Sequence, residues 1–301
     1  MAFSEPLSGS RAPVADALSA VIVNYNASDH VVDCVRSLYA DGVGDVVLAD
    51  NASSDDLAGA LSALDQRPVL VATGANLGFG AGANRGVQAT STPLVAIMNA
   101  DVVVEPGASK VLVEEFERDP SLAVLGPRVE NCDGSLYPSA RTFPTLLDAA
   151  GHAVFGFVAP QNRFTRRYRM LDWDHASAST VDWVSGTFLV VRRSVFDALG
   201  GFDEGYFMYV EDVDLCWRAR ELGARVAYEP SARVIHAIGA SSEQTPYRMI
   251  LAHHRSLWRF SRRTTVGVRR LALPVVGVAL AGRVLLAWLQ RAIRRRPHAS
   301  L

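Results

Sequence analysis

Short apolar runs alternate with amphipathic stretches over the first hundred residues of the chain. Continuous apolar runs are typical of strands buried on both faces, and apolar residues at helical spacing are typical of the helices that cover them. The predicted elements are strand 17–26, helix 30–40, strand 45–51, helix 57–64, strand 68–74, helix 81–89 and strand 93–101. This alternation predicts an α/β fold with a doubly wound, Rossmann-like sheet over residues 18–105.

The second half of the chain is less regular before its pattern returns. Prolines interrupt residues 120–180, where we expect them to break regular elements: Pro127, Pro138, Pro144 and Pro160. Outside that interval the pattern predicts helix 110–118, strand 186–192, helix 211–222 and strand 225–228. We therefore expect residues 106–243 to form the second half of the same domain, and residues 1–17 to form a flexible N-terminus.

Polar residues follow the apolar runs of three predicted strands. They are Asn24, Tyr25 and Asn26 after the first, Asp50 and Asn51 after the second, and Asn99 and Asp101 after the fourth. Parallel strands present their carboxyl ends at one edge of the sheet, where doubly wound folds bind ligands. The sequence therefore predicts a ligand site at this edge.

Asn99 and Asp101 share one face of their strand, because alternate strand residues point the same way. One carboxylate and one amide are a sparse ligand set for a hard cation. Mg²⁺ or Mn²⁺ completes such a set with water and substrate phosphate oxygens. A metal–diphosphate site is one interpretation, and an Asp that caps the following turn is the alternative.

A glycine-rich segment, Gly78-x-Gly80-x-x-Ala83, lies between a predicted strand and a helix. Together with Asp101 about twenty residues later, it matches the dinucleotide-binding layout of an oxidoreductase. The segment follows the third strand, however, and not the first. The segment therefore has three interpretations: the cofactor site of an oxidoreductase, a turn with a purely structural role, or a nucleotide site of another kind.

The densest acidic cluster lies at the start of the helix predicted over 211–222. Its members are Asp203, Glu204, Glu211, Asp212 and Asp214. Carboxylates in a first helical turn interact favourably with the helix dipole, which is the structural explanation. The segment around them is apolar and aromatic, so one of these carboxylates is also a candidate general base.

Histidines near the C-terminus are candidate ligands. His236 ends an apolar run. It is either a metal ligand or a hydrogen-bonded residue of the core or of the sheet edge. His253 and His254, which precede Arg255, are candidate anion ligands or ordinary members of a basic segment.

Charge is divided unevenly along the chain. Residues 1–243 carry 18 basic and 31 acidic side chains, whereas residues 244–301 carry 12 Arg and no Asp or Glu. Within this tail, residues 271–290 are apolar and, as a helix, roughly 30 Å long, which is enough to span a bilayer. Pro274, Arg283 and arginines on both sides argue against spanning.

We therefore expect residues 244–301 to be a helical, membrane-associating tail that lies in the interface of an anionic membrane. Nucleic-acid binding is the alternative for an Arg-rich tail, and the apolar residues between the arginines argue against it.

Composition excludes several classes of protein. The chain has 301 residues, of which 49% are hydrophobic and 20% charged, so it is neither disordered nor fibrous. Cys34, Cys132 and Cys216 lie far apart, which indicates neither a disulfide framework nor a zinc site. The first twenty residues lack a basic segment and an apolar run, so they predict no signal peptide and favour a cytoplasmic protein.

Seven motifs follow one another over about residues 18–260: VIVNYN, VVLADNASSD, NLGFGAGANRG, MNAD, VSGTFLVVRR, GGFDEGYFMYVEDVDLCWRAR and RVIHAIGASS. In this order they resemble the family-2 glycosyltransferases, in particular their bacterial rhamnosyltransferase branch. The resemblance implies a GT-A fold with a mixed sheet flanked by helices. It also implies an inverting sugar transfer that depends on Mg²⁺ or Mn²⁺.

The resemblance assigns donor roles to residues of this chain. Asp50 would accept a hydrogen bond from the imide N–H of uracil or thymine, in a pocket shaped by Asn24, Tyr25, Asn26 and Asn51. Asn76, Gly78 and Asn84 would lie along the nucleotide. Asp101 would bind the metal as part of a D-x-D element whose first Asp is replaced by Asn99, and His236 would complete the metal site.

On the acceptor side, Asp212 would be the catalytic base, and Trp183, Phe207 and Glu211 would contact the acceptor. The donor implied is dTDP-rhamnose. The implied acceptor is N-acetylglucosamine linked by a diphosphate to a polyprenol at the inner face of the cell membrane, in synthesis of the arabinogalactan linker of the cell wall.

Two functional alternatives remain within the fold. One is a transferase with another donor or acceptor, since the residues do not distinguish thymine from uracil. The other is a non-catalytic nucleotide-sugar-binding scaffold, which has no need of Asp101, Asp212 and His236 together.

Overall fold

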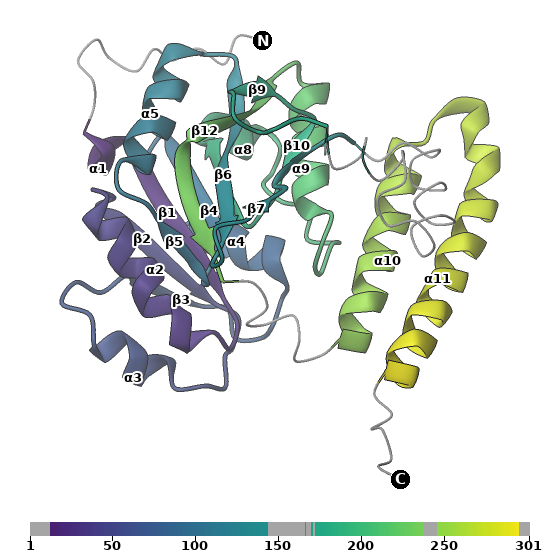
Figure 1. The fold of residues 1–301 in the computed structure, drawn as a ribbon, viewed down its shortest axis with the longest axis horizontal. Helices are drawn as coiled ribbons and strands as arrows, with labels where there is room; N and C mark the ends of the chain where they lie inside the picture. The colour runs from purple at the N-terminus through teal and green to yellow at the C-terminus, as the bar shows by residue number, and fades with distance from the viewer. Residues whose placement is uncertain (1–12, 144–165, 167–169, 171, 238–245, 295–301) are drawn as a thin grey trace.

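Figure 1 shows the computed structural model of the chain, which describes residues 13–143, 166, 170, 172–237 and 246–294. Its centre is a mixed sheet to which ten strands of the described residues contribute. In sheet order the main strands are β3 (Val69–Ala72), β2 (Asp45–Asp50), β1 (Leu18–Asn24), β4 (Leu94–Asn99), β11 (Phe188–Arg192), β6 (Leu122–Asn131), β12 (Arg225–His236) and β5 (Val102–Val104). Short strands complete it, β7 (Leu136–Tyr137) on β6 and β9 (Ser179–Thr180) on β12, while β8 (Ala140–Arg141) pairs with β10 (Trp183–Val184) separately.

The predicted parallel half is confirmed. Strands β3, β2, β1 and β4 are all parallel. Strand β11 is antiparallel to both β4 and β6, and β12 is parallel to β6, so β6 and β12 point the same way as β4. Asn24, Asp50, Asn99 and His236 therefore end their strands at the same edge of the sheet.

Helices cover both faces of this sheet (Figure 1). One apolar cluster joins the sheet to α2 (Ser28–Ala40), α3 (Leu57–Ser62) and α5 (Ala108–Arg118). A second joins it to α4 (Phe79–Val87), α8 (Arg193–Ala198) and α9 (Glu211–Glu221). Strand β1 is buried along its whole length, and its residues alternate between the two clusters, which explains its continuous apolar run.

Three predictions about elements were wrong. Pro127 does not break the chain but lies inside β6, opposite an irregularity of β12 between Glu229 and Arg233, where a missing N–H is tolerated. Strand β12 does not stop at Tyr228 but continues to His236. Within the expected flexible N-terminus, Val14–Ala17 form helix α1 with Ala17 buried, whereas residues 1–12 lie outside the described part.

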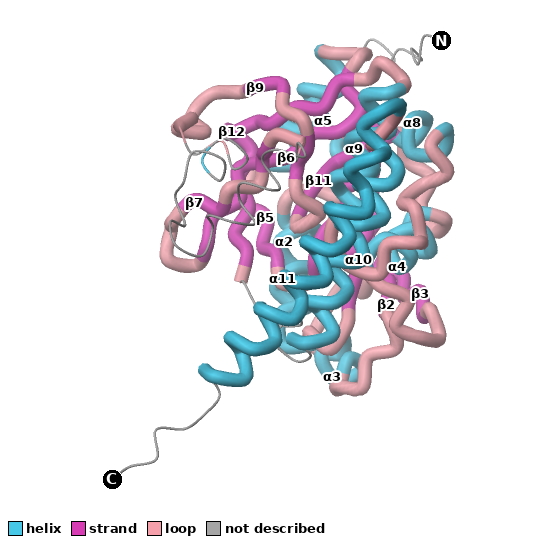
Figure 2. The backbone as a smooth tube through the Cα atoms, turned by 90° about the vertical axis from the view of Figure 1, so that its right-hand side faces the viewer, coloured by secondary structure: helices cyan, strands magenta, loops and turns pink. Residues whose placement is uncertain are grey.

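The C-terminal tail is helical, as predicted, and forms a hairpin. It consists of α10 (Pro246–Thr264), the short 3₁₀ helix η1 (Gly267–Ala272) and α11 (Leu273–Arg294). Helix α10 lies between the sheet domain and α11, and Figure 2 shows the two helices running side by side. The Trp288 indole N–H donates to the Tyr247 carbonyl at 3.3 Å, so the two arms contact each other directly.

Candidate active site

Asp50 is held rigidly at the end of β2. Its carboxylate accepts hydrogen bonds from the Asn24 amide at 3.0 Å, from the Ser53 hydroxyl and from the Ser53 backbone N–H at 3.2 Å. Asn24 is fully buried, so it shapes the site by orienting Asp50 and not by touching a ligand. Ser53 was not predicted, although it stands in the short polar turn that follows Asp50.

The loop before α4 is built around Gly78. The side-chain oxygen Oδ1 of Asn76 accepts from the Gly78 N–H at 3.1 Å, and the Asn51 side-chain amide donates to the Gly78 carbonyl at 3.0 Å. Gly78 has φ of 89°, and a Cβ there would lie 1.9 Å from the Phe207 carbonyl oxygen. Only glycine allows this loop to approach Phe207 so closely.

A pocket of about 150 Å³ opens beside this loop. Its lining includes seven of the predicted site residues: Tyr25, Asn51, Asn76, Gly78, Asn99, Asp101 and Phe207. Helix α10 contributes Arg248 and Met249, which sequence reasoning missed because the tail was assigned to the membrane alone. A larger cavity of about 350 Å³, lined by residues such as Asp182 and Arg220, contains none of the predicted residues.

Asp101 and His236 meet where the β4–β5 turn passes the end of β12. The Asp101 Oδ1 atom lies 3.2 Å from His236 Nε2, and both side chains are 9% exposed. The Asn99 amide nitrogen lies 3.5 Å from the same ring nitrogen, and Tyr137 packs edge-on against the ring. His236 Nδ1 is buried without a hydrogen-bond partner among the described residues.

Protein ligands at this point are few. Across the described residues, no group of three or more His, Cys, Asp or Glu side chains is placed to hold a metal ion. Among the described residues, Asp101 and His236 are thus the pair that would hold a metal ion here, and water or phosphate oxygens would be suitable as further ligands.

Asp212 lies at the start of α9, next to Gly186, which precedes β11. Its carboxylate accepts from the Gly186 N–H and the Val213 N–H, each at 2.8 Å. Burial raises the pKa of Asp212, and these two hydrogen bonds oppose the rise. Thr187 follows Gly186, and its backbone carbonyl accepts from the Asn99 N–H at 3.1 Å. Residues 186–187 therefore connect Asp212 with the Asn99–Asp101 turn.

Two of the three residues predicted to contact the acceptor are buried. Glu211 is 5% exposed, and its Oε2 has no partner among the described residues. Trp183 is 4% exposed, its indole N–H donates to the Thr142 carbonyl at 2.9 Å, and the Arg141 guanidinium lies over its ring. Phe207 is 36% exposed and lines the pocket, so it alone of the three presents a surface.

Asn84, predicted to lie along the nucleotide, forms hydrogen bonds to the loop that precedes α9. Its amide donates to the Phe202 carbonyl and accepts from the Phe202 N–H, both at 2.9 Å, and it also donates to Glu204 at 3.1 Å. Asn26 is likewise used in the loop: it has φ of 51°, and its side-chain oxygen accepts from the Ser54 N–H at 2.7 Å.

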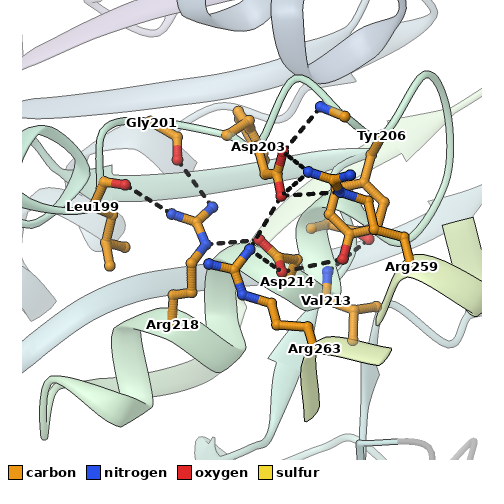
Figure 3. A network of polar contacts seen from close by, with 12 residues as sticks. Leu199, Gly201, Asp203, Tyr206, Val213, Asp214, Arg218, Arg259 and Arg263 are labelled. Carbon is orange, nitrogen blue, oxygen red and sulfur yellow. Dashed lines mark hydrogen bonds and ion pairs between the residues drawn. The ribbon is translucent and has the colours of Figure 1, made fainter. Parts of the chain in front are cut away.

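The acidic cluster divides into members with different partners. Asp203 and Asp214 pair with arginines, as Figure 3 shows. Arg218 donates to Asp214 at 2.7 Å, and Arg263 lies 3.1 Å from Asp203 and 3.2 Å from Asp214. Asp212 instead is half-buried and accepts from two backbone N–H groups, and the positive charge of Arg141 also opposes the rise in its pKa.

The histidines of α10 do not line the pocket. His253 packs on Tyr209, with ring centroids 5.2 Å apart. His254 faces the Ile250 carbonyl at 2.7 Å, and burial lowers its pKa. Both are consistent with packing of α10.

Comparison with known proteins agrees with this geometry. The profile described as "Glycosyltransferase like family 2" matches residues 15–256. The N-acetylglucosaminyl-diphospho-decaprenol L-rhamnosyltransferase of Mycobacterium tuberculosis is 38% identical over 258 residues, which are 81% of this chain and 84% of that protein.

Solved structures show the same fold. A mannosyltransferase from Pyrobaculum calidifontis in complex with GDP-Man and Mn²⁺ has a TM-score of 0.55 at 16% identity, over 96% of this chain and 79% of that one. The structure of GalNAc-T7 with UDP, GalNAc and Mn²⁺ has a TM-score of 0.54 at 15% identity, over 73% of this chain and 43% of that one. The predicted GT-A type fold is confirmed, and the oxidoreductase alternative is wrong. With the family profile covering most of its length and a relative 38% identical, the chain belongs to glycosyltransferase family 2.

Proposed function

We propose that this enzyme transfers L-rhamnose from dTDP-rhamnose to N-acetylglucosamine on a polyprenyl diphosphate. The observation that carries the proposal is the meeting of Asp101 and His236 at the pocket edge where β1 and β2 also end. The similarity to a Mycobacterium tuberculosis enzyme named for that sugar and acceptor supports the choice of substrates.

Asp50 is suited to bind the pyrimidine of the donor. Within the described residues its Oδ2 atom accepts one hydrogen bond, from the Ser53 N–H, so a lone pair is left for an imide N–H. Asn51 is 2% exposed and lines the pocket, and its Oδ1 has no partner among the described residues. A ligand donor would satisfy that buried oxygen.

A divalent cation fits between Asp101 and His236. Asp101 Oδ1 and His236 Nε2 lie 3.2 Å apart, so a carboxylate oxygen and an imidazole nitrogen would be available to hold the ion together. Mg²⁺ or Mn²⁺ bound there would neutralise negative charge on the diphosphate. The small number of protein ligands leaves positions for phosphate oxygens and water.

Asp212 would act on the acceptor. Its carboxylate takes the proton of the attacking sugar hydroxyl as that oxygen bonds to the anomeric carbon and the bond from that carbon to the diphosphate breaks. Two backbone N–H groups fix the carboxylate in place. One base and one displacement give inversion.

The C-terminal hairpin is suited to an anionic membrane surface. Residues 267–291 form a helical segment long and apolar enough to cross a membrane, and only 6% of its most apolar 18-residue stretch is buried. Exposed residues form one stripe along α11: Val275, Val278, Leu285 and Leu289. Arg283 is instead half-buried near His254 of α10, so the outward stripe is free of charge and favours a helix lying in the inner leaflet's interface.

A panel of donors tests the proposal. Purified enzyme is assayed with a short-chain lipid diphosphate carrying N-acetylglucosamine, and with dTDP-rhamnose, UDP-glucose, UDP-galactose or GDP-mannose. We expect transfer from dTDP-rhamnose that stops with EDTA and returns with Mg²⁺ or Mn²⁺. Preference for a UDP-sugar would indicate another transferase of the same family, and binding without any transfer would favour the scaffold.

A further inference from the structure

Helix α10 places one basic side chain, Arg248, in the wall of the donor pocket. We propose that Arg248 binds the diphosphate of the donor nucleotide, so that the C-terminal hairpin completes the donor site. The inference rests on the proposed function of the pocket as a nucleotide-sugar site. It adds a binding residue and a physical link between the membrane side of the protein and the donor.

The charge of the pocket favours this role. Among the described residues that line it, Asp101 is the only carboxylate and Arg248 is the only guanidinium or ammonium group. A divalent cation bound by one carboxylate does not carry enough positive charge to neutralise a nucleoside diphosphate completely. The planar guanidinium of arginine matches two phosphate oxygens at once.

Arg248 is not used elsewhere in the structure. It is exposed, and within the described part of the chain it forms no ion pair or hydrogen bond. Other arginines of the same helix behave differently, since Arg259 and Arg263 both pair with Asp203. A cation at a pocket wall without a protein partner is available for an anionic ligand.

The sheet domain fixes the position of α10 through several contacts. The Ser256 hydroxyl donates to the carbonyl of Met208, itself a pocket residue, at 3.0 Å. Further along, Arg259 lies 2.8 Å from Asp203 (Figure 3). Arg248 is therefore held beside the pocket by the domain and does not depend on the conformation of a loose tail.

On the side away from the domain, α10 packs against α11, and α11 carries the exposed apolar stripe. One hairpin thus contributes both the surface proposed to face the membrane and a wall of the donor pocket. We expect the donor to be bound more tightly when the hairpin is docked on the domain than when it is displaced.

Titration calorimetry on the full chain tests the role of Arg248. The probes are dTDP and UDP with MnCl₂, and thymidine binding is followed by ligand-observed NMR. Losing a hydrogen bond to a charged group weakens binding by about tenfold or more, which is the effect expected for Arg248→Ala on both diphosphates. Arg248→Lys should recover part of the affinity, and thymidine binding should not change.

Arg262→Ala is the matched control, because it removes the same charge from an exposed position of α10 outside the pocket. It should leave diphosphate affinity within about twofold of wild type, on the scale of an exposed charge. Unchanged diphosphate binding by Arg248→Ala would overturn the inference, as would an equal loss for thymidine, which would indicate a change in pocket shape. If the wild type bound neither diphosphate, the proposed function itself would fall.

Discussion

Glu211 and Asp212 are neighbours in sequence but have different surroundings. Each Asp212 oxygen accepts a backbone N–H, whereas Glu211 Oε2 is buried without a partner among the described residues. Burial, together with the charge of Asp212, raises the pKa of Glu211 to about 8. At neutral pH Glu211 is therefore mostly protonated, and Asp212 is the member of the pair that can accept a proton.

The first prediction concerns the base. Asp212→Asn keeps the shape of the side chain but cannot take the acceptor proton, so transfer should fall by about 10²-fold to 10⁴-fold. Affinity for Mn²⁺ and dTDP should persist, since Asp212 is not among the residues proposed to bind the nucleotide. Rates and affinities measured on the same preparation separate the two effects, and turnover within tenfold of wild type would contradict the assignment.

The second prediction concerns Glu211 and pH. Its pKa is about 8 in the folded protein and near 4.5 when unfolded, so the folded state binds more protons between these values. The free energy of unfolding should therefore fall as pH rises from about 4.5 to about 8. Glu211→Gln stays neutral and should show a weaker pH dependence in denaturant melts. Identical slopes for the two proteins would mean that Glu211 is already charged when folded.

At the scale of elements, α10 is attached to the domain by an ion-pair cluster (Figure 3). Asp203 accepts from Arg259 and Arg263, and Asp214, buried in α9, accepts from Arg218 and Arg263. Burial by itself would raise the pKa of Asp203, but hydrogen bonds from the Gly205 N–H and Arg259 lower it overall. The Asp203 contribution is therefore present at neutral pH and is lost only when pH falls through this lowered pKa.

The third prediction tests this attachment. Asp203→Asn removes the charge while keeping the shape, so α10 should detach more often. Loss of about 1 kcal/mol would raise amide hydrogen exchange in residues 246–264 by about fivefold. Asp197→Asn is the control, because Asp197 is exposed on α8 and forms no ion pair within the described residues. Equal exchange in both variants would show that apolar packing alone holds the helix.

At the scale of the whole molecule, opposite charges lie on different parts of the chain. Residues 244–301 contain 12 arginines, and the segment before them contains 31 acidic and 18 basic side chains. Not all of these arginines are available to a membrane, because Arg259 and Arg263 pair with the domain and Arg248 lines the pocket. Membrane attachment should therefore depend on the apolar stripe of α11 as well as on charge.

The fourth prediction follows from that division. If α11 lies in the interface, high salt or carbonate should release a good fraction of the protein from membranes, because salt screens the arginine contribution, about 1 kcal/mol for each residue near the surface. A chain that ends at Val266 keeps α10 and should bind nucleotide but transfer poorly to a long-chain lipid acceptor. Protein that stays in the pellet after carbonate would favour a spanning helix, and unchanged attachment after truncation would reject α11 as the anchor.

The sequence by itself determined the parallel half of the sheet and the residues at its strand ends. Continuous apolar runs and polar residues after them are local signals, so β1, β2 and β4 and the residues Asp50 and Asp101 could be found without a structure. The alternation of burial along β1 explains why such a run predicts a strand covered on both faces.

Only the tertiary structure decided which polar residues meet and which are used internally. Asp101 and His236 are 135 residues apart and come together because β12 lies beside β5 in the sheet. Asn84 and Trp183 are residue types that often contact ligands, but here both are buried and donate hydrogen bonds to distant segments of the chain, which no local sequence pattern indicates. Arg248 reaches the pocket because ion pairs fold the tail back onto the domain, and such long-range pairing depends on packing between distant segments, which sequence periodicity does not encode.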